Sequence, residues 1–417
     1  MVPVAPGAKK RRMEAAQGQG QQPEAMSGSS PTEPWPPPAM APEATHPKSA
    51  VKSQEPPPSL GAGEEGREGS GGGGGSDRIS GLPDAILGEI ISLLPIKEAA
   101  RTQTLASRWR HLWRSAPLSL DSGDLPDEGE TFRAGLISRI LAAHPGPARR
   151  FSVSVLQLLL SPTAVDSWIC SPALDNLQEL EFHIGELISL KSLSLLDSTF
   201  RLPDSTFRFS TTLRLATITK CHILEGTMEA LHFPKLRELA LESVHISEDS
   251  LQSMIAGSPV LECLLLSRCV GFGRVRINSQ SLVSIGVQKF SGQLIIENAP
   301  SLERLLQLEL CRELHVSIIA APKLKTLGWI SDSDYKFKMV FGSTAVQDLR
   351  SVCNTAVECS IKILAVNIYT LNLDMVLDLL RCFPCLEKLY IETFASGGTK
   401  IHGVVNTVML LDALISV

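Results

Sequence analysis

Residues 236–267 read LRELALESVHISEDSLQSMIAGSPVLECLLLS, and this stretch decides the fold of the larger part of the chain. The pattern Leu-x-x-Leu-x-Leu stands at both of its ends, at Leu236, Leu239 and Leu241 and again at Leu261, Leu264 and Leu266. Between the two copies, Leu251, Met254 and Ile255 recur at helical spacing behind a Ser-Glu-Asp start. The stretch therefore predicts a strand, a helix over 247–259 and a second strand.

Further copies of the leucine pattern begin at positions 177, 213, 282, 302, 324 and 386. From 213 to 324 the starts are separated by 23, 25, 21, 20 and 22 residues, a period typical of leucine-rich repeats. The second and third apolar residues of a copy lie two apart, so both point into the core. Because one unit alone leaves its leucines exposed, the units must stack. We expect an α/β solenoid with a curved parallel sheet over 150–395, helices between its strands, and one or two degenerate repeats between 324 and 386.

The strand residues that alternate with the leucines should lie on the concave face of that sheet. This register assigns to the concave face Glu179, Glu181, Glu238, Glu242, Ser284, Gln288, Thr326, Lys388 and Glu392. The first copies are acidic there, which favours a basic segment of a target protein. A solvated strand face explains the same charges without any partner.

The first 76 residues differ in composition from the rest of the chain. They hold 13 of the 27 prolines and 13 of the 31 glycines, so they bury too little apolar surface to offset the entropy of ordering. We interpret 1–76 as a disordered Pro/Gly-rich arm. Its basic tetrad, Lys9, Lys10, Arg11 and Arg12, is either a nuclear import signal or a solvated run of charge.

Two amphipathic helical patterns follow in 77–120. The first begins at Pro83, a residue suited to a helix start, and its apolar stripe ends at Pro95. The second runs from about Lys97 to Arg114, with Leu105, Trp109, Leu112 and Trp113 on one face. A unit of this size has a marginal core, so its remaining apolar surface suits a partner's binding site. The alternative is an ordinary helical hairpin packed on the next domain. A linker, 121–149, should contain one more helix from about Phe132 to Pro145.

Two segments of this region, LPDAILGEIISLLP (82–95) and ASRWRHLW (106–113), resemble the F-box at the head of plant F-box/leucine-rich-repeat proteins. The matching positions are Leu82, Pro83, Ile90, Leu94, Pro95, Ser107 and Trp109. The resemblance implies docking onto a Skp-type adaptor and, through it, onto a cullin scaffold. Together with the apolar excess it assigns adaptor contact to Leu82, Pro83, Ile86, Leu87, Ile90, Leu94, Pro95, Leu105, Trp109, Leu112 and Trp113.

Residues 355–393 resemble the lead-in to the FBD region that follows the repeats in many of these plant proteins. After about residue 393 the chain departs from that family pattern. We therefore expect an atypical or truncated C-terminus, with a divergent apolar tail over 396–417.

The sequence contains no pattern that supports catalysis. Cys382 and Cys385 have CxxC spacing, but no second pair completes a zinc site and cysteine is a common filler at this place in a repeat. The nine histidines stand singly, without a metal-binding or nucleophile-elbow pattern. We expect no metal and no cofactor.

Charge and hydropathy limit the partners. A net charge of −5 argues against nucleic acid, and charges or prolines interrupt every long apolar run, which argues against a membrane span. The N-terminus lacks the apolar stretch of a signal peptide. These features predict an intracellular protein of the nucleus or cytoplasm, or both.

The leading hypothesis is therefore a substrate-recognition subunit of an SCF-type (Skp-cullin-F-box) E3 ubiquitin ligase. In this hypothesis the F-box holds the adaptor and the repeats hold an unknown target. The alternative is a non-catalytic scaffold, or a decayed family member, that binds the adaptor without presenting a target. An enzyme is the third and weakest class.

Overall fold

The computed structural model describes residues 79, 81–144, 147–184, 200–228, 230–308, 314–331, 338–341, 344–347, 360–368 and 373–393. These residues all lie within one compact unit, 75–417. The predicted arm with its basic tetrad and the predicted tail, 396–417, lie outside the described residues.

Residues 79–117, the helical unit, hold a short series of helices rather than the two that the sequence predicts. They are α1 (Asp84–Ser92), α2 (Ile96–Arg101), the 3-10 turn η1 (Thr102–Thr104) and α3 (Ser107–Ser115). The single predicted helix over 97–114 is wrong because the Thr102 and Thr104 hydroxyls donate to the carbonyls of Ala99 (2.6 Å) and Arg101 (2.8 Å). Such bonds compete with helix continuation, and Ala106 then adopts an extended conformation.

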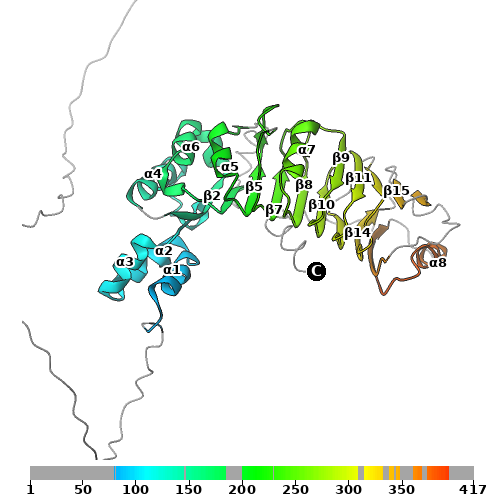
Figure 1. Ribbon diagram of the computed structural model, residues 1–417, viewed down its shortest axis with the longest axis horizontal. Coiled ribbons are helices and arrows are strands. Elements are labelled where there is room, and N and C mark those ends of the chain that lie inside the picture. Colours follow the sequence, from blue (N-terminus) through cyan, green and yellow to red (C-terminus); the bar gives the residue numbers. More distant parts are fainter. Residues whose placement is uncertain are drawn as a thin grey trace, which may run out of the picture. The chain divides into compact units, whose positions relative to one another are not determined.

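The repeats form one parallel sheet, called the main sheet, which has eleven strands among the described residues. In order across the sheet these are β1 (Leu118–Asp121), β2 (Ala148–Ser154), β3 (Glu179–His183), β5 (Leu215–Thr219), β7 (Glu238–Glu242), β8 (Cys263–Ser267), β10 (Ser284–Gln288), β12 (Arg304–Gln307), β14 (Thr326–Ser331), β17 (Ile363–Ile368) and β18 (Lys388–Thr393). Spatial order follows chain order, so the colour passes from green to orange along the sheet (Figure 1). Each predicted copy of the leucine pattern yields a strand that begins two residues after the first residue of the copy. The copy at 177, for example, gives the strand that begins at Glu179, and the copy at 386 gives the strand that begins at Lys388.

The main sheet begins earlier than the sequence analysis expected. β1 lies at the end of the stretch assigned to the F-box, and β2 begins within the expected linker; the two strands pair in parallel. Leu118, Leu120, Phe151 and Val153 alternate along them and are buried in the same core as the repeats. Helix α4 (Glu130–Ala143) connects them, as predicted, and ends before Pro145. These two strands could have been predicted from apolar residues at every second position, a pattern that the search for Leu-x-x-Leu-x-Leu copies does not detect.

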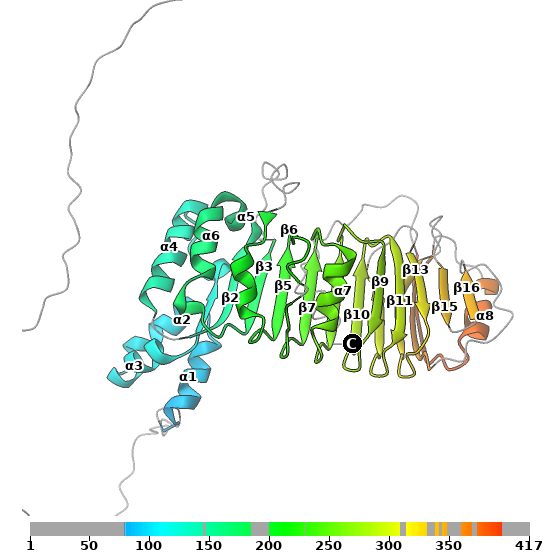
Figure 2. The ribbon, with the colours of Figure 1, turned by 45° about the horizontal axis from the view of Figure 1, so that its top comes forward.

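The leucine face of the main sheet is covered first by helices and then by a second sheet. The helices are α4, α5 (Val155–Leu160), α6 (Pro162–Ile169) and α7 (Glu248–Ala256). The second sheet contains β9 (Arg274–Asn278), β11 (Gly292–Asn298), β13 (Leu314–Ile318), β15 (Lys338–Phe341) and β16 (Thr344–Gln347), coloured from yellow-green to orange in Figure 2. Residues of both sheets share one hydrophobic core.

The expectation of helices between the strands holds only for the earlier repeats and for α8 (Leu373–Cys382). α7 agrees with the prediction, and the Ser247 hydroxyl caps it by accepting from the Ser250 amide. Between residues 274 and 347 the described connecting segments contain strands instead. In β9, buried Val275 and Ile277 alternate with exposed arginine and asparagine, a period that excludes a helix with one apolar face. Short elements complete the fold, namely η2 (Ser122–Asp124), η3 (Pro172–Leu174), β4 (Phe200–Arg201), η5 (Asp204–Phe209) and β6 (Cys221–His222).

Candidate functional site

The helical unit has a small core of its own, which contains several of the predicted contact residues. Leu87, Trp109 and Leu112 are buried in it, and Leu82, Leu94 and Trp113 pack partly buried against it. The prediction that Leu87, Trp109 and Leu112 present themselves to a partner is therefore corrected. In so small a unit the largest apolar side chains turn inward, because nothing else can form a core.

The outer surface of the helical unit is nevertheless apolar. Among the predicted contact residues, Pro83, Ile86, Ile90, Pro95 and Leu105 are exposed. Ile79 and Leu93, which the sequence analysis did not select, are exposed as well, Leu93 to 67%. We call the side chains of Ile79, Ile86, Ile90, Leu93 and Leu105 the apolar surface. Large apolar side chains exposed together are typical of surfaces through which proteins bind a partner.

Arg108 of α3 fixes the start of α1. Its guanidinium donates to the Leu82 carbonyl at 2.6 Å and, through Nε, to the Asp84 carboxylate at 2.7 Å. The helical unit is in turn attached to the main sheet. Ile96 of α2 is buried in the core of the repeats, and Arg149 of β2 contacts Glu89 of α1 at 3.4 Å. These two contacts attach the helical unit, which carries the apolar surface, to the main sheet.

The second candidate surface is the concave face, defined as the face of the main sheet opposite the leucines. The register aligns its side chains in rows across the strands. Ser152, Glu181 and Thr217 are neighbours in one row, and Arg150, Glu179 and Leu215 in another. This register places Glu179 and Glu181 on the concave face, as the sequence predicts.

The residues predicted for the concave face are less exposed to solvent than expected. Glu179 and Glu238 are half-buried, whereas Glu181, Glu242, Ser284, Gln288 and Thr326 are buried. Strands about 4.8 Å apart place equivalent side chains in contact, so neighbours shield one another. The Arg304 side chain donates to the Ser284 hydroxyl at 2.7 Å, and Ser267 donates to Gln288 at 2.7 Å. Lys388 is exposed, and the side chain of Glu392 lies outside the described residues.

The acidic end of the concave face is organised around Arg150, which the sequence analysis did not select. Its guanidinium lies 2.7 Å from the Glu181 carboxylate, 3.4 Å from Asp121 and 3.6 Å from Glu179. Burial raises the pKa of Glu181 to about 7; Arg150 opposes this, and the carboxylates of Asp121, Glu179 and Glu238 add to it. Burial also lowers the pKa of the neighbouring His183.

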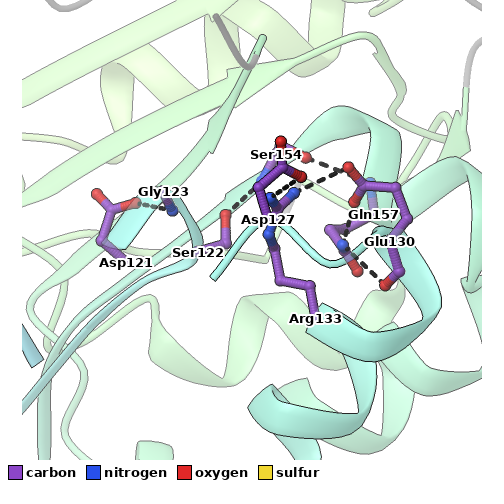
Figure 3. Close-up of polar contacts among 8 residues, drawn as sticks. All are labelled: Asp121, Ser122, Gly123, Asp127, Glu130, Arg133, Ser154 and Gln157. Carbon is purple, nitrogen blue, oxygen red and sulfur yellow. Dashed lines mark hydrogen bonds and ion pairs between the residues drawn. The ribbon is translucent and has the colours of Figure 1, made fainter. Parts of the chain in front are cut away.

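A polar cluster fixes the loop that carries Asp121 (Figure 3). Asp121 accepts from the Gly123 amide at 2.8 Å, and the Ser122 hydroxyl accepts from the Ser154 amide at 3.1 Å. Nearby, Arg133 pairs with Asp127 and Glu130 at 2.8 Å each, and the Gln157 amide donates to Glu130. The cluster ties the start of α4 to α5 through Gln157, and η2, which follows Asp121, to the end of β2 through Ser154.

The cysteines are placed as structural side chains. Cys221 donates to the Thr219 carbonyl at 3.1 Å and Cys269 to the Leu241 carbonyl at 3.3 Å. Burial raises the pKa of the Cys263 thiol to about 11 and that of Cys269 to about 12, so these thiols are poor nucleophiles at neutral pH. Cys382 is buried and Cys385 exposed. Among the described residues, no three His, Cys, Asp or Glu side chains come together as a metal site.

Comparisons with known proteins assign two families to different parts of the chain. Residues 79–120 match the F-box domain, and residues 165–391 match the family described as FBD-associated F-box protein At5g56370, LRR repeats. Within the part of the chain that the structure describes, none of the helices has the length and apolar content that crossing a bilayer requires.

Similar curated proteins come from Arabidopsis thaliana. The F-box/FBD/LRR-repeat protein At4g00160 is 29% identical over 250 residues, which cover 56% of this chain and 51% of that protein. The putative F-box protein At3g58860 is 30% identical over 52% of this chain and 48% of its own length. The F-box/LRR-repeat protein At4g14103 is 31% identical over 46% and 50%. The chain thus spans about half the length of the curated relatives that it matches.

Proposed function

The chain belongs to the LRR-repeat family of FBD-associated F-box proteins, and we propose that it is the substrate-recognition subunit of an SCF-type E3 ubiquitin ligase. The helical unit docks on a Skp-type adaptor, which binds the cullin scaffold. The repeats hold a target protein beside the catalytic subunits. The mechanism is proximity, because tethering raises the effective concentration of the target's lysines near the transferable ubiquitin. The proposal assigns no catalytic residue to this chain.

The observation that carries the proposal is the apolar surface on a unit that matches the F-box. Ile86, Ile90 and Leu105 are 49, 38 and 66% exposed, and exposed apolar side chains of this size are the anchors that protein interfaces desolvate. Leu87, Trp109 and Leu112 support the surface from inside and do not themselves form it. Of the eleven residues assigned to the adaptor, we therefore propose Pro83, Ile86, Ile90, Pro95 and Leu105 as direct contacts, together with Ile79 and Leu93.

Capture of the adaptor by surface variants tests the docking step. Leu105→Arg places a charge where the interface must be desolvated, so the affinity for a Skp-type adaptor should fall about 30-fold or more. Ile319→Arg is the matched control, because Ile319 is 62% exposed and lies in the repeats. Its affinity should equal that of the wild type. Equal losses in the two variants, or no loss in either, would show that the apolar surface does not bind the adaptor.

Presentation of a target is a separate step and needs a separate measurement. Proteins captured by the full chain in the presence of a proteasome inhibitor should turn over faster when the chain is expressed. They should return to their basal turnover with Leu105→Arg. Capture of the adaptor without accelerated turnover of any captured protein would favour the scaffold.

A further inference from the structure

The carboxylates of the concave face gather at its N-terminal end. Asp121, Glu179, Glu181 and Glu238 come from β1, β3 and β7, which are near neighbours in the main sheet. Arg150 lies within 3.6 Å of Asp121, Glu179 and Glu181, and Glu238 stands in the same row as Glu179, two strands along. Further along the sheet, the equivalent row holds Cys263, Ser284, Arg304 and Thr326. From β8 to β14 this row therefore carries no carboxylate among the described residues.

A second observation at the same spot concerns hydroxyl groups. Thr217 is 1% exposed and pairs in register with Glu181, on the same face. Its Oγ1 has no hydrogen-bond partner among the described residues, and the same holds for Oγ1 of buried Thr219, two positions further along β5. A buried polar group without a partner costs about 1–3 kcal/mol. Carboxylate and hydroxyl oxygens that converge in this way suit a donor with several hydrogens, such as a lysine ammonium.

Side chains at the rim of this spot remain accessible. The side chains of Asp121, Arg150 and Glu179 are 28, 30 and 24% exposed. Glu181 and Thr217 lie deeper and form the floor. Arg150 is shared among Asp121, Glu179 and Glu181, and Glu179 also lies 3.5 Å from Arg149, so an added cation would meet three carboxylates beside two guanidinium groups.

We propose that this end of the concave face, formed by Asp121, Glu179, Glu181, Thr217 and Glu238, binds a lysine- or arginine-rich segment of the protein that the chain recruits. The inference rests on the proposed function and names the chemical class of its target. Complementary charge contributes specificity and a fast association rate more than raw affinity, which suits a receptor that must choose among proteins.

The register also sets the spacing of the cations. Glu179 and Glu238 flank Leu215 in one row, one strand away on either side, so they stand about 10 Å apart. A peptide in the polyproline-II conformation has three residues per turn and advances about 3.1 Å per residue, so two basic side chains three positions apart lie on the same side and reach both carboxylates. Half-buried Leu215 offers an apolar bed for the aliphatic stems of lysine or arginine.

Peptide binding to the full chain tests the proposal. The probes are short fluorescent peptides that differ in one feature, with lysine, glutamate or serine at every third position of a glycine–serine background. The lysine peptide should bind, and rising salt should weaken it because rim charges are screened. Binding should strengthen between pH 6 and pH 8 as Glu181 ionises. The other charged or titratable side chains that face this spot are Asp121, Arg149, Arg150, Glu179, His183 and Glu238. Because burial lowers the pKa of His183, this imidazole stays neutral across most of this pH range.

Substitutions at the rim locate the site. Glu179→Gln and Glu238→Gln should each weaken the lysine peptide about threefold to tenfold. Glu297→Gln, which removes one carboxylate from the outer face of β11, should leave it unchanged. Equal binding of the three peptides, or an equal loss in Glu297→Gln, overturns the proposal. Urea midpoints of the variants identify any loss caused by unfolding, and two independent rim variants keep the result decisive if one of them misfolds.

The outcome is separable from that of the proposed function. Leu105→Arg should lose the adaptor and keep the lysine peptide, whereas Glu179→Gln and Glu238→Gln should lose the peptide and keep the adaptor. A wild-type chain that binds the lysine peptide and no Skp-type adaptor refutes the ligase role alone. One that binds the adaptor and none of the peptides refutes the basic-segment site alone.

Discussion

Gln307 occupies a place in the repeat that the other copies give to an apolar residue. It is 6% exposed, its Oε1 has no hydrogen-bond partner among the described residues, and a cavity of about 10 Å³ lies beside it. Val287, Leu305 and Leu327 line the same cavity. A polar oxygen in such surroundings loses its hydration and gains nothing in return.

Replacing Gln307 by leucine should therefore stabilise the repeats. The free energy of unfolding should rise by about 1–3 kcal/mol, seen as a higher urea midpoint with an unchanged slope. Gln293→Leu is the control, because Gln293 is exposed and its Oε1 accepts from Arg274; its effect should stay within about 0.5 kcal/mol. A lower midpoint for Gln307→Leu would mean that Gln307 makes a bond worth keeping.

Glu181 couples the stability of the chain to pH. Burial raises its pKa from 4.5 in a model peptide to about 7 in the folded chain, so the folded state holds a proton that the unfolded state has already released. The stabilising contribution of this proton is complete below about pH 4.5 and is lost as the pH rises through 7. The chain should thus lose stability between pH 5 and pH 8.

The variant Glu181→Gln stays neutral and should remove this part of the pH dependence. Urea unfolding at pH 5.5 and pH 8 should give a smaller difference in the variant than in the wild type, by up to about 2 kcal/mol. Parallel pH profiles for the two proteins would mean that Arg150 keeps Glu181 ionised in the fold at low pH. Glu303→Gln, at an exposed carboxylate, controls for the loss of one charge.

At the scale of the element, the helical unit depends on Trp109. Its indole is 7% exposed and packs with Leu87, Ile91 and Leu112. Trp109→Ala should cost about 3–5 kcal/mol, more than a unit of this size is expected to tolerate. Limited proteolysis should then cut within 79–117 while the repeats resist. Leu105→Ala should leave the cleavage pattern unchanged; loss of resistance there too would place Leu105 in the core.

The elements that the sequence predicted well are those whose signal is local. Leu236, Leu239 and Leu241 alternate within one strand, and Ser247 begins α7 with its own cap, so each segment specifies its own conformation. The break at Ala106 was missed because hydroxyls at Thr102 and Thr104 outcompete a strong apolar stripe. β9 and β11 were missed because helices were extended by analogy from one repeat, although Val275 and Ile277 alternate with period two.

Burial and charge pairing were less accessible to the sequence, because both depend on strands far apart in the chain. The leucine pattern placed Glu181 on the concave face, but its burial requires Ser152 and Thr217 as neighbours, from strands that begin at residues 148 and 215. The role of Arg150 likewise follows from β2, which carries no leucine copy. In the helical unit, the same amphipathic pattern is compatible with Trp109 facing a partner or facing inward. Only the packing of three short segments decides it.

At the scale of the whole molecule, the two proposed binding surfaces lie on one compact unit. The apolar surface belongs to the helical unit, and the acidic end of the concave face begins at β1, directly after it in the chain. Arg149 links the helical unit to the acidic end, because it contacts Glu89 on α1 and Glu179 on β3. A target held at the acidic end would therefore be presented at a defined place relative to the adaptor, which proximity catalysis requires.

The most direct test of the central claim is amide hydrogen exchange of the full chain with and without a bound Skp-type adaptor. Exchange should be slower in the complex over 82–95 and 102–108, around Ile86, Ile90 and Leu105. Exchange on the outer strands β9, β11 and β13 should stay unchanged. Protection confined to the repeats, or none within 79–117 under saturating adaptor, would contradict it.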